Sequence, residues 1–385
     1  MAKLPKKLEQ KLEKRRLEDA LRILPEQQSL IDFSSNDYLG LAGTFELSKL
    51  TDELLDLSQL YKNGSTGSRL LSGNHTLYGD LEEFLAHYHD SESALIFNSG
   101  YDANIGFFSS VPQRGDIIFY DELIHASIRD GIKMGNAKSY RFAHNDLNDL
   151  RQKVEMSLRV QSRSMETEIY IITESVFSMD GDSPDLEALV KFCSENDYNL
   201  IVDEAHAVGI FGEGKGLICQ LGLEKEVFAR VVTFGKALGS HGAVILCNSE
   251  LKAYLVNFAR SLIYTTALSP HSIASVLIAY SFMMKEGEVQ RKKLYSNIHC
   301  FKKQISLLKY GSMFVKSDSA ICCLIVPGNQ KVKQLSKRLR EEGFDVKPIL
   351  SPTVKAGEER LRFCLHSYNT KEEIESLFQI IRAQI

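Results

Sequence analysis

Four side chains that could do carbonyl chemistry together stand at or just after short apolar runs of this sequence: Lys236, Asp203, His206 and His125. A desolvated lysine amine attacks a carbonyl carbon and forms a Schiff base. An aspartate beside a pyridine nitrogen keeps that nitrogen protonated, so that the ring withdraws electrons. These residue types are the ones that pyridoxal phosphate (PLP) chemistry requires, and we expect no metal ion.

The four side chains can meet only if the apolar runs are strands of one sheet. Strand-like runs alternate with amphipathic stretches such as Leu77–Tyr88 and Leu186–Glu195, a pattern typical of a mostly parallel sheet covered by helices. Ligands bind at the carboxyl ends of such strands, where these side chains fall. The predicted strands are Ala94–Asn98, Asp116–Tyr120, Glu168–Glu174, Asn199–Asp203, Arg230–Phe234 and Ala243–Cys247.

The two ends of the chain differ from this central region. Leucines at helical spacing within Lys3–Leu24 predict a helix with one apolar stripe, packed on the body of the protein or on a partner subunit. Beyond a long helix from Pro270 to about Leu308, further strands and helices alternate: Ala320–Val326, Gln330–Glu342, Leu361–Leu365 and Lys371–Ala383. We therefore expect an α/β protein with an N-terminal helical arm (1–40), a large domain (41–285) and a smaller α+β C-terminal domain (286–385).

Composition indicates an ordinary globular protein. Among 385 residues, 44% are hydrophobic and 25% charged, and the net charge of −4 argues against nucleic acid as a partner. Seven scattered cysteines without a CxxC motif indicate reduced thiols. The charged N-terminus does not resemble a secretory signal, and no apolar run is long enough to span a membrane. We expect a cytoplasmic protein.

Three local patterns are weaker signals. Asp203-Glu204-Ala205-His206 spells a helicase signature and Gly209–Lys215 fits GxxxxGK, but Gly216 stands where a phosphate loop needs Ser or Thr. The order of the two motifs is also inverted. His87 and His89 lack a third ligand, which indicates solvated side chains. In contrast, Gly100 and Tyr101 open an apparent helix after a strand and could bind a phosphate, with the Thr233 hydroxyl close by.

Several longer segments resemble the α-oxoamine synthases, fold-type I PLP enzymes that condense an amino acid with an acyl thioester and release CO₂. The resemblance runs in order from about residue 10 to the end of the chain. It is carried by Thr233-Phe-Gly-Lys236-Ala-Leu-Gly239, Val202-Asp203-Glu-Ala-His206, Glu174-Ser-Val-Phe-Ser178, Ser35-Asn36-Asp-Tyr-Leu-Gly40, Gly64–Gly73, Ile124-His125-Ala-Ser127 and Tyr264-Thr-Thr266.

The resemblance implies a role for each matched residue. Lys236 would bind the cofactor and handle the amino acid's α-proton, Asp203 would pair with the pyridine nitrogen, and His206 would bond the phenolic oxygen. His125 would stack on the ring. The remaining implied cofactor contacts are Gly100, Tyr101, Thr233 and Ser178, with Thr266 reaching in from a second subunit; the implied substrate contacts are Arg362, Asn36, Thr353, Arg22 and His125. Glu174 would line the same pocket.

Within the family, the chain resembles the branch that condenses L-alanine with a pimeloyl thioester, carried by CoA or by acyl carrier protein, in biotin biosynthesis. The family also implies a homodimer with shared active sites. Glycine with acetyl-CoA or succinyl-CoA, and serine with a fatty acyl-CoA, would use the same lysine–aspartate core. A catalytically silent partner subunit would lack the lysine, and Lys236 is present.

Overall fold

The computed structural model describes residues 3–24, 29–160 and 167–384, which form two compact units. The large unit comprises Asn36–Ser178 and Ser183–Lys292. The small unit comprises Met1–Ser35, Met179–Asp182 and Lys293–Ile385, so three separate stretches of chain build it. The three-part division at residues 40 and 285 stays a prediction. No helix in the described ranges is long and apolar enough to cross a membrane.

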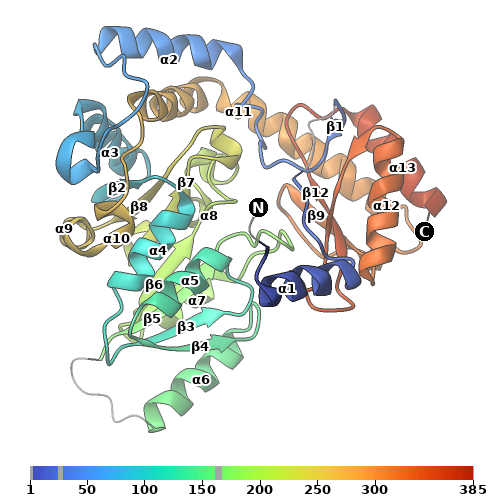
Figure 1. Ribbon diagram of the computed structural model, residues 1–385, viewed down its shortest axis with the longest axis horizontal. Coiled ribbons are helices and arrows are strands. Elements are labelled where there is room, and N and C mark those ends of the chain that lie inside the picture. The colour runs from blue at the N-terminus through green and yellow to red at the C-terminus, as the bar shows by residue number, and fades with distance from the viewer. Residues whose placement is uncertain (1–2, 25–28, 161–166, 385) are drawn as a thin grey trace. The chain divides into compact units, whose positions relative to one another are not determined.

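A seven-stranded sheet forms the centre of the large unit (Figure 1). Its strand order is β2-β8-β7-β6-β5-β3-β4, and β8 alone runs antiparallel to its neighbours β2 and β7. The strands are β2 Ser93–Phe97, β3 Ile117–Asp121, β4 Lys138–Phe142, β5 Ile169–Glu174, β6 Asn199–Asp203, β7 Ala229–Thr233 and β8 Ala243–Cys247. The expected mostly parallel α/β architecture is confirmed.

Helices cover both faces of this sheet because successive strand residues point to opposite sides. Ile118 packs in one buried cluster with α4 and α5, whereas Ile117 and Phe119 pack in another with α6 and α7. The helices of this unit are α2 Phe45–Leu57, α3 Thr76–Tyr88, α4 Gly100–Ser110, α5 Ala126–Met134, α6 Leu147–Val160, α7 Leu186–Ser194, α8 Leu217–Leu221, α9 Ser249–Phe258 and α10 Arg260–Ile263.

The small unit contains the antiparallel sheet β11-β12-β9 and a short parallel pair of β1 with β10. The long helix α11 (Pro270–Ser306) begins in the large unit and ends in this one. Its other elements are α1 Lys6–Leu17, β1 Ile31–Asp32, β9 Ile321–Ile325, α12 Asn329–Glu341, β10 Phe344–Asp345, β11 Lys347–Ile349, β12 Arg360–Cys364 and α13 Lys371–Gln384.

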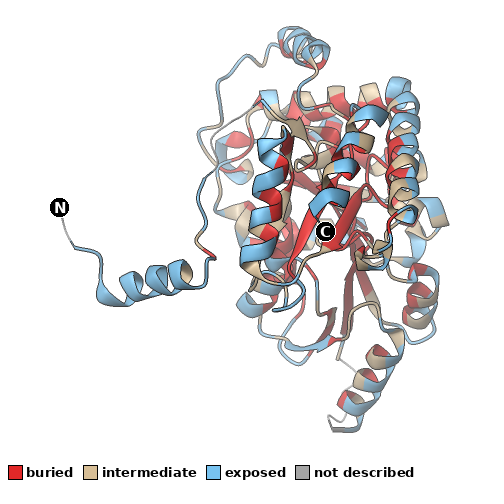
Figure 2. Cartoon of the chain, turned by 90° about the vertical axis from the view of Figure 1, so that its right-hand side faces the viewer, coloured by how far each residue is buried: buried red, intermediate tan, exposed pale blue. Residues whose placement is uncertain are grey.

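The N-terminal helix is shorter than the sequence predicted. Asp19 adopts a left-handed φ of 52°, and the backbone N–H groups of Asp19 and Ala20 donate to the carbonyls of Arg16 and Arg15. These contacts close the last helical turn, so α1 ends at Leu17 and Arg22 lies beyond the helix. α1 buries none of its residues (Figure 2). The expected packing of its leucines on the body of the chain is therefore not observed.

Candidate active site

A pocket of about 190 Å³ opens at the carboxyl ends of β5, β6 and β7, entirely within the large unit. Seven of the predicted site residues line this pocket together with Glu174: Gly100, Tyr101, His125, Asp203, His206, Thr233 and Lys236. Asn104 and Ser127, for which the sequence predicted no role, line it as well. The structure thus brings the four chemically active side chains together, as the strand-end argument predicted.

Asp203, the last residue of β6, is held as a hydrogen-bond acceptor at both carboxylate oxygens. Its Oδ1 accepts the backbone N–H of Ala205 at 3.0 Å, and its Oδ2 accepts the side-chain amide of Asn104 at 3.0 Å. The side chain is almost fully buried, and β6 lies between two other parallel strands. A carboxylate fixed in this way can accept a further proton donor such as a pyridinium N–H.

His125 follows β3 and caps the start of α5. Its ring Nδ1 lies 2.7 Å from Ser127 Oγ and accepts the backbone N–H of Ser127 at 3.3 Å. The backbone N–H of His125 donates to Glu174 Oε1 at 2.6 Å. Burial is the main cause that lowers the pKa of His125, and the positive charge of Lys236 acts in the same direction against the opposing charge of Asp203. The ring is therefore uncharged at neutral pH.

Glu174 is the last residue of β5 and pairs in register with Asp203 on β6. Burial, followed by the negative charge of Asp203, raises the pKa of Glu174 to about 8, although Lys236 opposes this shift. The carboxyl group is therefore protonated at neutral pH. Only one of the two neighbouring carboxyl groups needs to carry a charge, which is the arrangement that two close acids favour.

Lys236 adopts a left-handed backbone conformation with a φ of 52°, which is uncommon outside glycine. It lies in the turn after β7, at the start of a short 3₁₀ segment that ends at Leu238. Strained backbone of this kind clusters at functional sites, where the surrounding structure enforces it. Lys236 also lines the pocket, so the uncommon backbone conformation and the candidate site coincide.

The start of α4 and the end of β7 both contribute to the lining of the pocket, through Gly100, Tyr101 and Thr233. The Ser99 side chain caps α4 and accepts the backbone N–H of Asp102, and Gly100 is the first helical residue. A Cβ at Gly100 would stand 3.7 Å from Thr233 Cβ, in the space between helix and strand. A helix N-terminus attracts anions, and a small residue there leaves room for one.

Tyr38 is a site residue that the sequence analysis did not assign. Its buried hydroxyl lies 2.7 Å from His206 Nδ1 and 3.1 Å from Asn36 Oδ1. His206 is thereby oriented from its Nδ1 side, and Asn36 joins the same cluster. The signal was present in the sequence, because Tyr38 lies within the matched segment Ser35–Gly40.

Not every predicted site residue lies at this pocket. Ser178 and Thr266 are in the large unit but do not line it, and Asn98 donates to the Thr266 backbone carbonyl at 2.6 Å. Arg22, Thr353 and Arg362 belong to the small unit. There, exposed Arg22 lies 3.5 Å from Thr353 Oγ1, and buried Arg362 lies on β12 opposite Cys323 of β9.

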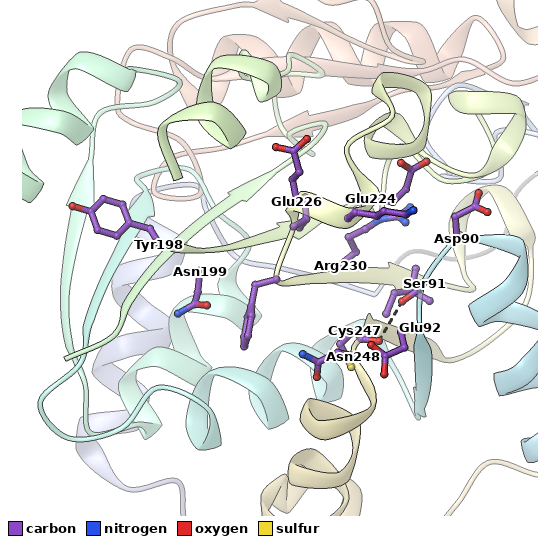
Figure 3. Close-up of a pocket in the computed structure, with 14 residues that line it drawn as sticks. Asp90, Ser91, Glu92, Tyr198, Asn199, Glu224, Glu226, Arg230, Cys247 and Asn248 are labelled. Carbon is purple, nitrogen blue, oxygen red and sulfur yellow. Dashed lines mark hydrogen bonds between the residues drawn. The ribbon is translucent and has the colours of Figure 1, made fainter. Parts of the chain in front are cut away.

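A larger hollow of about 630 Å³ lies at the opposite ends of the strands, near the start of β6 and β7 (Figure 3). Asp90 and Glu224 at its edge, with Cys219, form one group of possible metal ligands in the described ranges. However, Lys215 pairs with Asp90 at 2.8 Å, and burial raises the pKa of Cys219 to about 11. These groups are therefore poorly suited to a cation, and the hollow lacks the chemistry of the strand-end pocket.

His89, close to this hollow, corrects one expectation. It is fully buried rather than solvated, and its ring bonds the Tyr280 hydroxyl at 2.9 Å and the Lys215 carbonyl at 3.0 Å. Two residues of the helicase-like and phosphate-loop-like matches, Glu204 and Gly216, have structural roles in packing. Glu204 forms a buried ion pair with Arg230, and Gly216 (φ 110°) lies so close that a Cβ there would meet the Glu204 carboxylate at 2.7 Å.

Comparison with known proteins agrees with this geometry. The family model described as aminotransferase class I and II matches residues 28–381. An 8-amino-7-oxononanoate synthase of Emericella nidulans is 41% identical over 94% of this chain and 90% of its own length. The Haemophilus ducreyi protein of the same name is 38% identical over 92% of each chain.

Solved structures show the same relationship. Serine palmitoyltransferase of Sphingomonas wittichii matches with a TM-score of 0.88 and 26% identity, covering 100% of this chain and 98% of its own. The 8-amino-7-oxononanoate synthase of Francisella tularensis matches with a TM-score of 0.77 and 31% identity, covering 93% and 98%. A further serine palmitoyltransferase match, at 25% identity, was solved with a PLP internal aldimine.

Fold and site together define a fold-type I, PLP-dependent transferase. The chain belongs to the aminotransferase class I and II family, and within it to the α-oxoamine synthases, as its 8-amino-7-oxononanoate synthase relatives show. The pocket fits the cofactor: an amine at Lys236, an accepting carboxylate at Asp203 and a capped helix start at Gly100 stand around one cavity. The resemblance seen in the sequence is confirmed.

Proposed function

We propose that the protein condenses L-alanine with a pimeloyl thioester, carried by CoA or by acyl carrier protein, and releases CO₂ and 8-amino-7-oxononanoate for biotin biosynthesis. Bound PLP supplies the electron-withdrawing ring that makes the α-carbon of alanine acidic. The observation that carries the proposal is the convergence of Lys236, Asp203 and His125 on one pocket, in a chain 41% identical to a synthase of this name.

Each of the lining residues has a role in this reaction. Lys236 would hold the cofactor through its amine and would move the α-proton of the substrate. Asp203 would bond the pyridine nitrogen and stabilise its positive charge, while His206 would donate to the phenolic oxygen. His125 would contact the ring, and Gly100, Tyr101 and Thr233 would hold the phosphate. Glu174 lines the same pocket, and Ser178, which lies outside this lining, is proposed as a further cofactor contact.

The substrate carboxylate requires a different kind of contact. Arg362 binds it through two parallel N–H···O bonds, a geometry that a lysine cannot reproduce. Asn36 assists it, and Thr353 with Arg22 binds the far carboxylate of the acyl chain. The 3.5 Å approach of Arg22 to Thr353 supports a shared position for these two residues.

The protein acts as a homodimer in which Thr266 of each subunit reaches the phosphate in the other. The exposure of Thr266 and its absence from the pocket of its own chain support this arrangement. We place the reaction in the cytoplasm, in agreement with seven cysteines that form no disulfide in the described part of the chain.

The first experiment gives the PLP-loaded protein pimeloyl-CoA with L-alanine, glycine or L-serine in separate reactions. We expect CO₂ release and a product of the mass of 8-amino-7-oxononanoate with alanine alone. Lys236→Ala should abolish both, together with the visible absorbance of bound cofactor, whereas exposed Lys225→Ala should retain them. A variant at Lys236 with near-normal turnover would overturn the mechanism.

Serine palmitoyltransferase is the second candidate, because its structures cover the whole chain with a TM-score of 0.88. A reaction with L-serine and palmitoyl-CoA is therefore run in parallel. Turnover there, without turnover of alanine and pimeloyl-CoA, would keep the family and replace the substrates. The higher sequence identity to the 8-amino-7-oxononanoate synthases favours the first proposal.

A further inference from the structure

Asn104 links two residues of the active site through a single amide group. Both hydrogens of its Nδ2 are used, one toward Asp203 Oδ2 and one toward Ser127 Oγ, each at 3.0 Å. Asn104 is 2% exposed, and its Oδ1 has no hydrogen-bond partner in the described part of the chain. An amide turned the other way would place this oxygen against the Asp203 carboxylate. The orientation is therefore fixed, at the cost of one unsatisfied acceptor.

The hydroxyl of Ser127 connects the Asn104 amide to the ring of His125. Ser127 is fully buried, and its Oγ accepts from Asn104, so its single proton is directed to His125 Nδ1 at 2.7 Å. The backbone N–H of Ser127 approaches the same nitrogen at 3.3 Å. Two donors therefore meet at Nδ1, and a nitrogen that accepts cannot also carry a proton.

We propose that Asn104 and Ser127 are positioning residues that hold His125 as the neutral tautomer with its proton on Nε2. The opposite tautomer would set Nδ1–H against the backbone N–H of Ser127, which lies 3.3 Å from Nδ1, and would deprive the buried Ser127 hydroxyl proton of the acceptor that Nδ1 provides. The imidazolium form would do the same. The tautomer follows from the distances among Asn104, Ser127 and His125.

Its use in catalysis rests on the proposed function. In that reaction, His125 faces the cofactor and the substrate as an uncharged hydrogen-bond donor through Nε2. The same Asn104 amide fixes Asp203, so the group that donates and the group that bonds the pyridine nitrogen are oriented together. A hydrogen-bond network that is fixed in this way needs no rearrangement during the reaction.

The test reads the tautomer directly. The full-length protein is labelled with ¹⁵N in its histidine rings, and two-bond ¹H–¹⁵N spectra are recorded with PLP bound and after its removal. His125→Gln identifies the signals of His125. We expect a single Nε2–H tautomer in both samples. A dominant Nδ1–H form, or an equal mixture, in the unsubstituted protein would overturn the proposal without any variant.

Three variants separate positioning from general stability. Ser127→Ala should shift the tautomer ratio of His125 toward Nδ1–H by about five- to tenfold, since one hydrogen bond is lost. Ser127→Thr retains the hydroxyl and should restore the Nε2–H form. Ser109→Ala removes a hydroxyl from the same helix as Asn104, where it bonds only Ile105 O, and should change nothing. An unchanged ratio in Ser127→Ala would refute the role of Ser127.

The proposed function and the proposed tautomer are tested by different results. If the protein binds no PLP or does not use alanine, the His125 spectrum of the cofactor-free protein still decides the tautomer. Conversely, a wrong tautomer leaves the condensation reaction and its substrates untouched.

Discussion

Glu174 is a buried carboxyl group that the site keeps protonated at neutral pH. Its pKa is raised from 4.5 to about 8, so the folded protein binds this proton more tightly than the unfolded chain. Its contribution to stability is therefore full below pH 4.5 and is lost as the pH rises to about 8. Glu174→Gln cannot titrate, and the free energy of unfolding of the wild type should fall relative to this variant across that range.

Urea unfolding of both proteins at intervals from pH 5 to 8.5 measures the difference. Exposed Glu187→Gln serves as the control and should follow the wild-type curve. Parallel curves for wild type and Glu174→Gln would mean that Glu174 is ionised in the folded protein.

Arg362 gives a second prediction at this scale. Arg362→Lys keeps the charge but would lose the proposed two-pronged contact with the substrate carboxylate, so KM for L-alanine should rise about tenfold or more. Steady-state kinetics measure this at saturating acyl donor, with cofactor absorbance as the check on folding. Exposed Arg338→Lys should leave KM unchanged, and an unchanged KM in Arg362→Lys would remove this residue from the substrate site.

Residue types and strand ends were enough to predict the cluster of Lys236, Asp203, His206 and His125. Asn104, Ser127 and Tyr38 were not assigned because they act through other side chains. Their importance depends on distances between segments far apart in the sequence, such as the 3.0 Å between Asn104 and Asp203. A polar residue in an amphipathic helix carries no sign of such a contact in the sequence alone.

At the scale of elements, a buried ion pair joins β7 to the residue that follows β6. Its partners are Arg230 on β7 and Glu204 directly after β6. Arg230 donates from Nε to Glu204 Oε2 at 2.8 Å and from Nη1 to the His89 carbonyl at 2.9 Å, and its Nη2 reaches the Lys215 carbonyl at 3.0 Å. Because Glu204 directly follows Asp203, this anchor also holds the end of the catalytic strand. The side chains of both charged residues are at most 3% exposed.

Arg230→Met should lower the free energy of unfolding by about 3–5 kcal/mol, because it leaves the Glu204 charge buried and unpaired. Adding Glu204→Leu removes that charge and should recover part of the loss. Urea unfolding of the two single variants and the double variant forms a cycle that measures the coupling. Strictly additive losses would contradict the ion pair as the cause.

For elements with buried apolar runs, the sequence predicted the first and last residues to within about one position. Polar elements at the edge of the sheet were not predicted. β4 (Lys138–Phe142) was missed because it is an edge strand with only Phe142 buried, and no apolar run marks it. The N-terminal helix was predicted to be too long because its leucine spacing continues past Asp19. The left-handed backbone of Asp19 ends the helix. Local backbone geometry of that kind overrides periodicity.

At the scale of the whole molecule, the exposed leucines of α1 are the surface that we expect to contact a second copy of the chain in the proposed homodimer. Leu8 and Leu12 are 47% and 41% exposed, and no residue of α1 is buried. Replacing both by serine should weaken the proposed homodimer, since the apolar surface they would bury is lost. Sedimentation velocity at a series of dilutions measures the dissociation constant.

A double variant of the polar face, Lys7→Ser with Glu9→Ser, is the matched control and should leave the dimer unchanged. If the leucine variant dissociates no more readily than the control, α1 is not part of the interface. In that case its apolar stripe has another partner.

The three-part construction of the small unit has a consequence for protein synthesis. Ile31 pairs with Phe344, and Arg360 forms an ion pair with Asp180, so the first 35 residues and Met179–Asp182 find these partners near the end of the chain. A ribosome therefore releases every residue of the large unit before the small unit can close. The first of its segments must wait, exposed to chaperones and proteases, through the translation of more than three hundred codons between Ile31 and its partner Phe344.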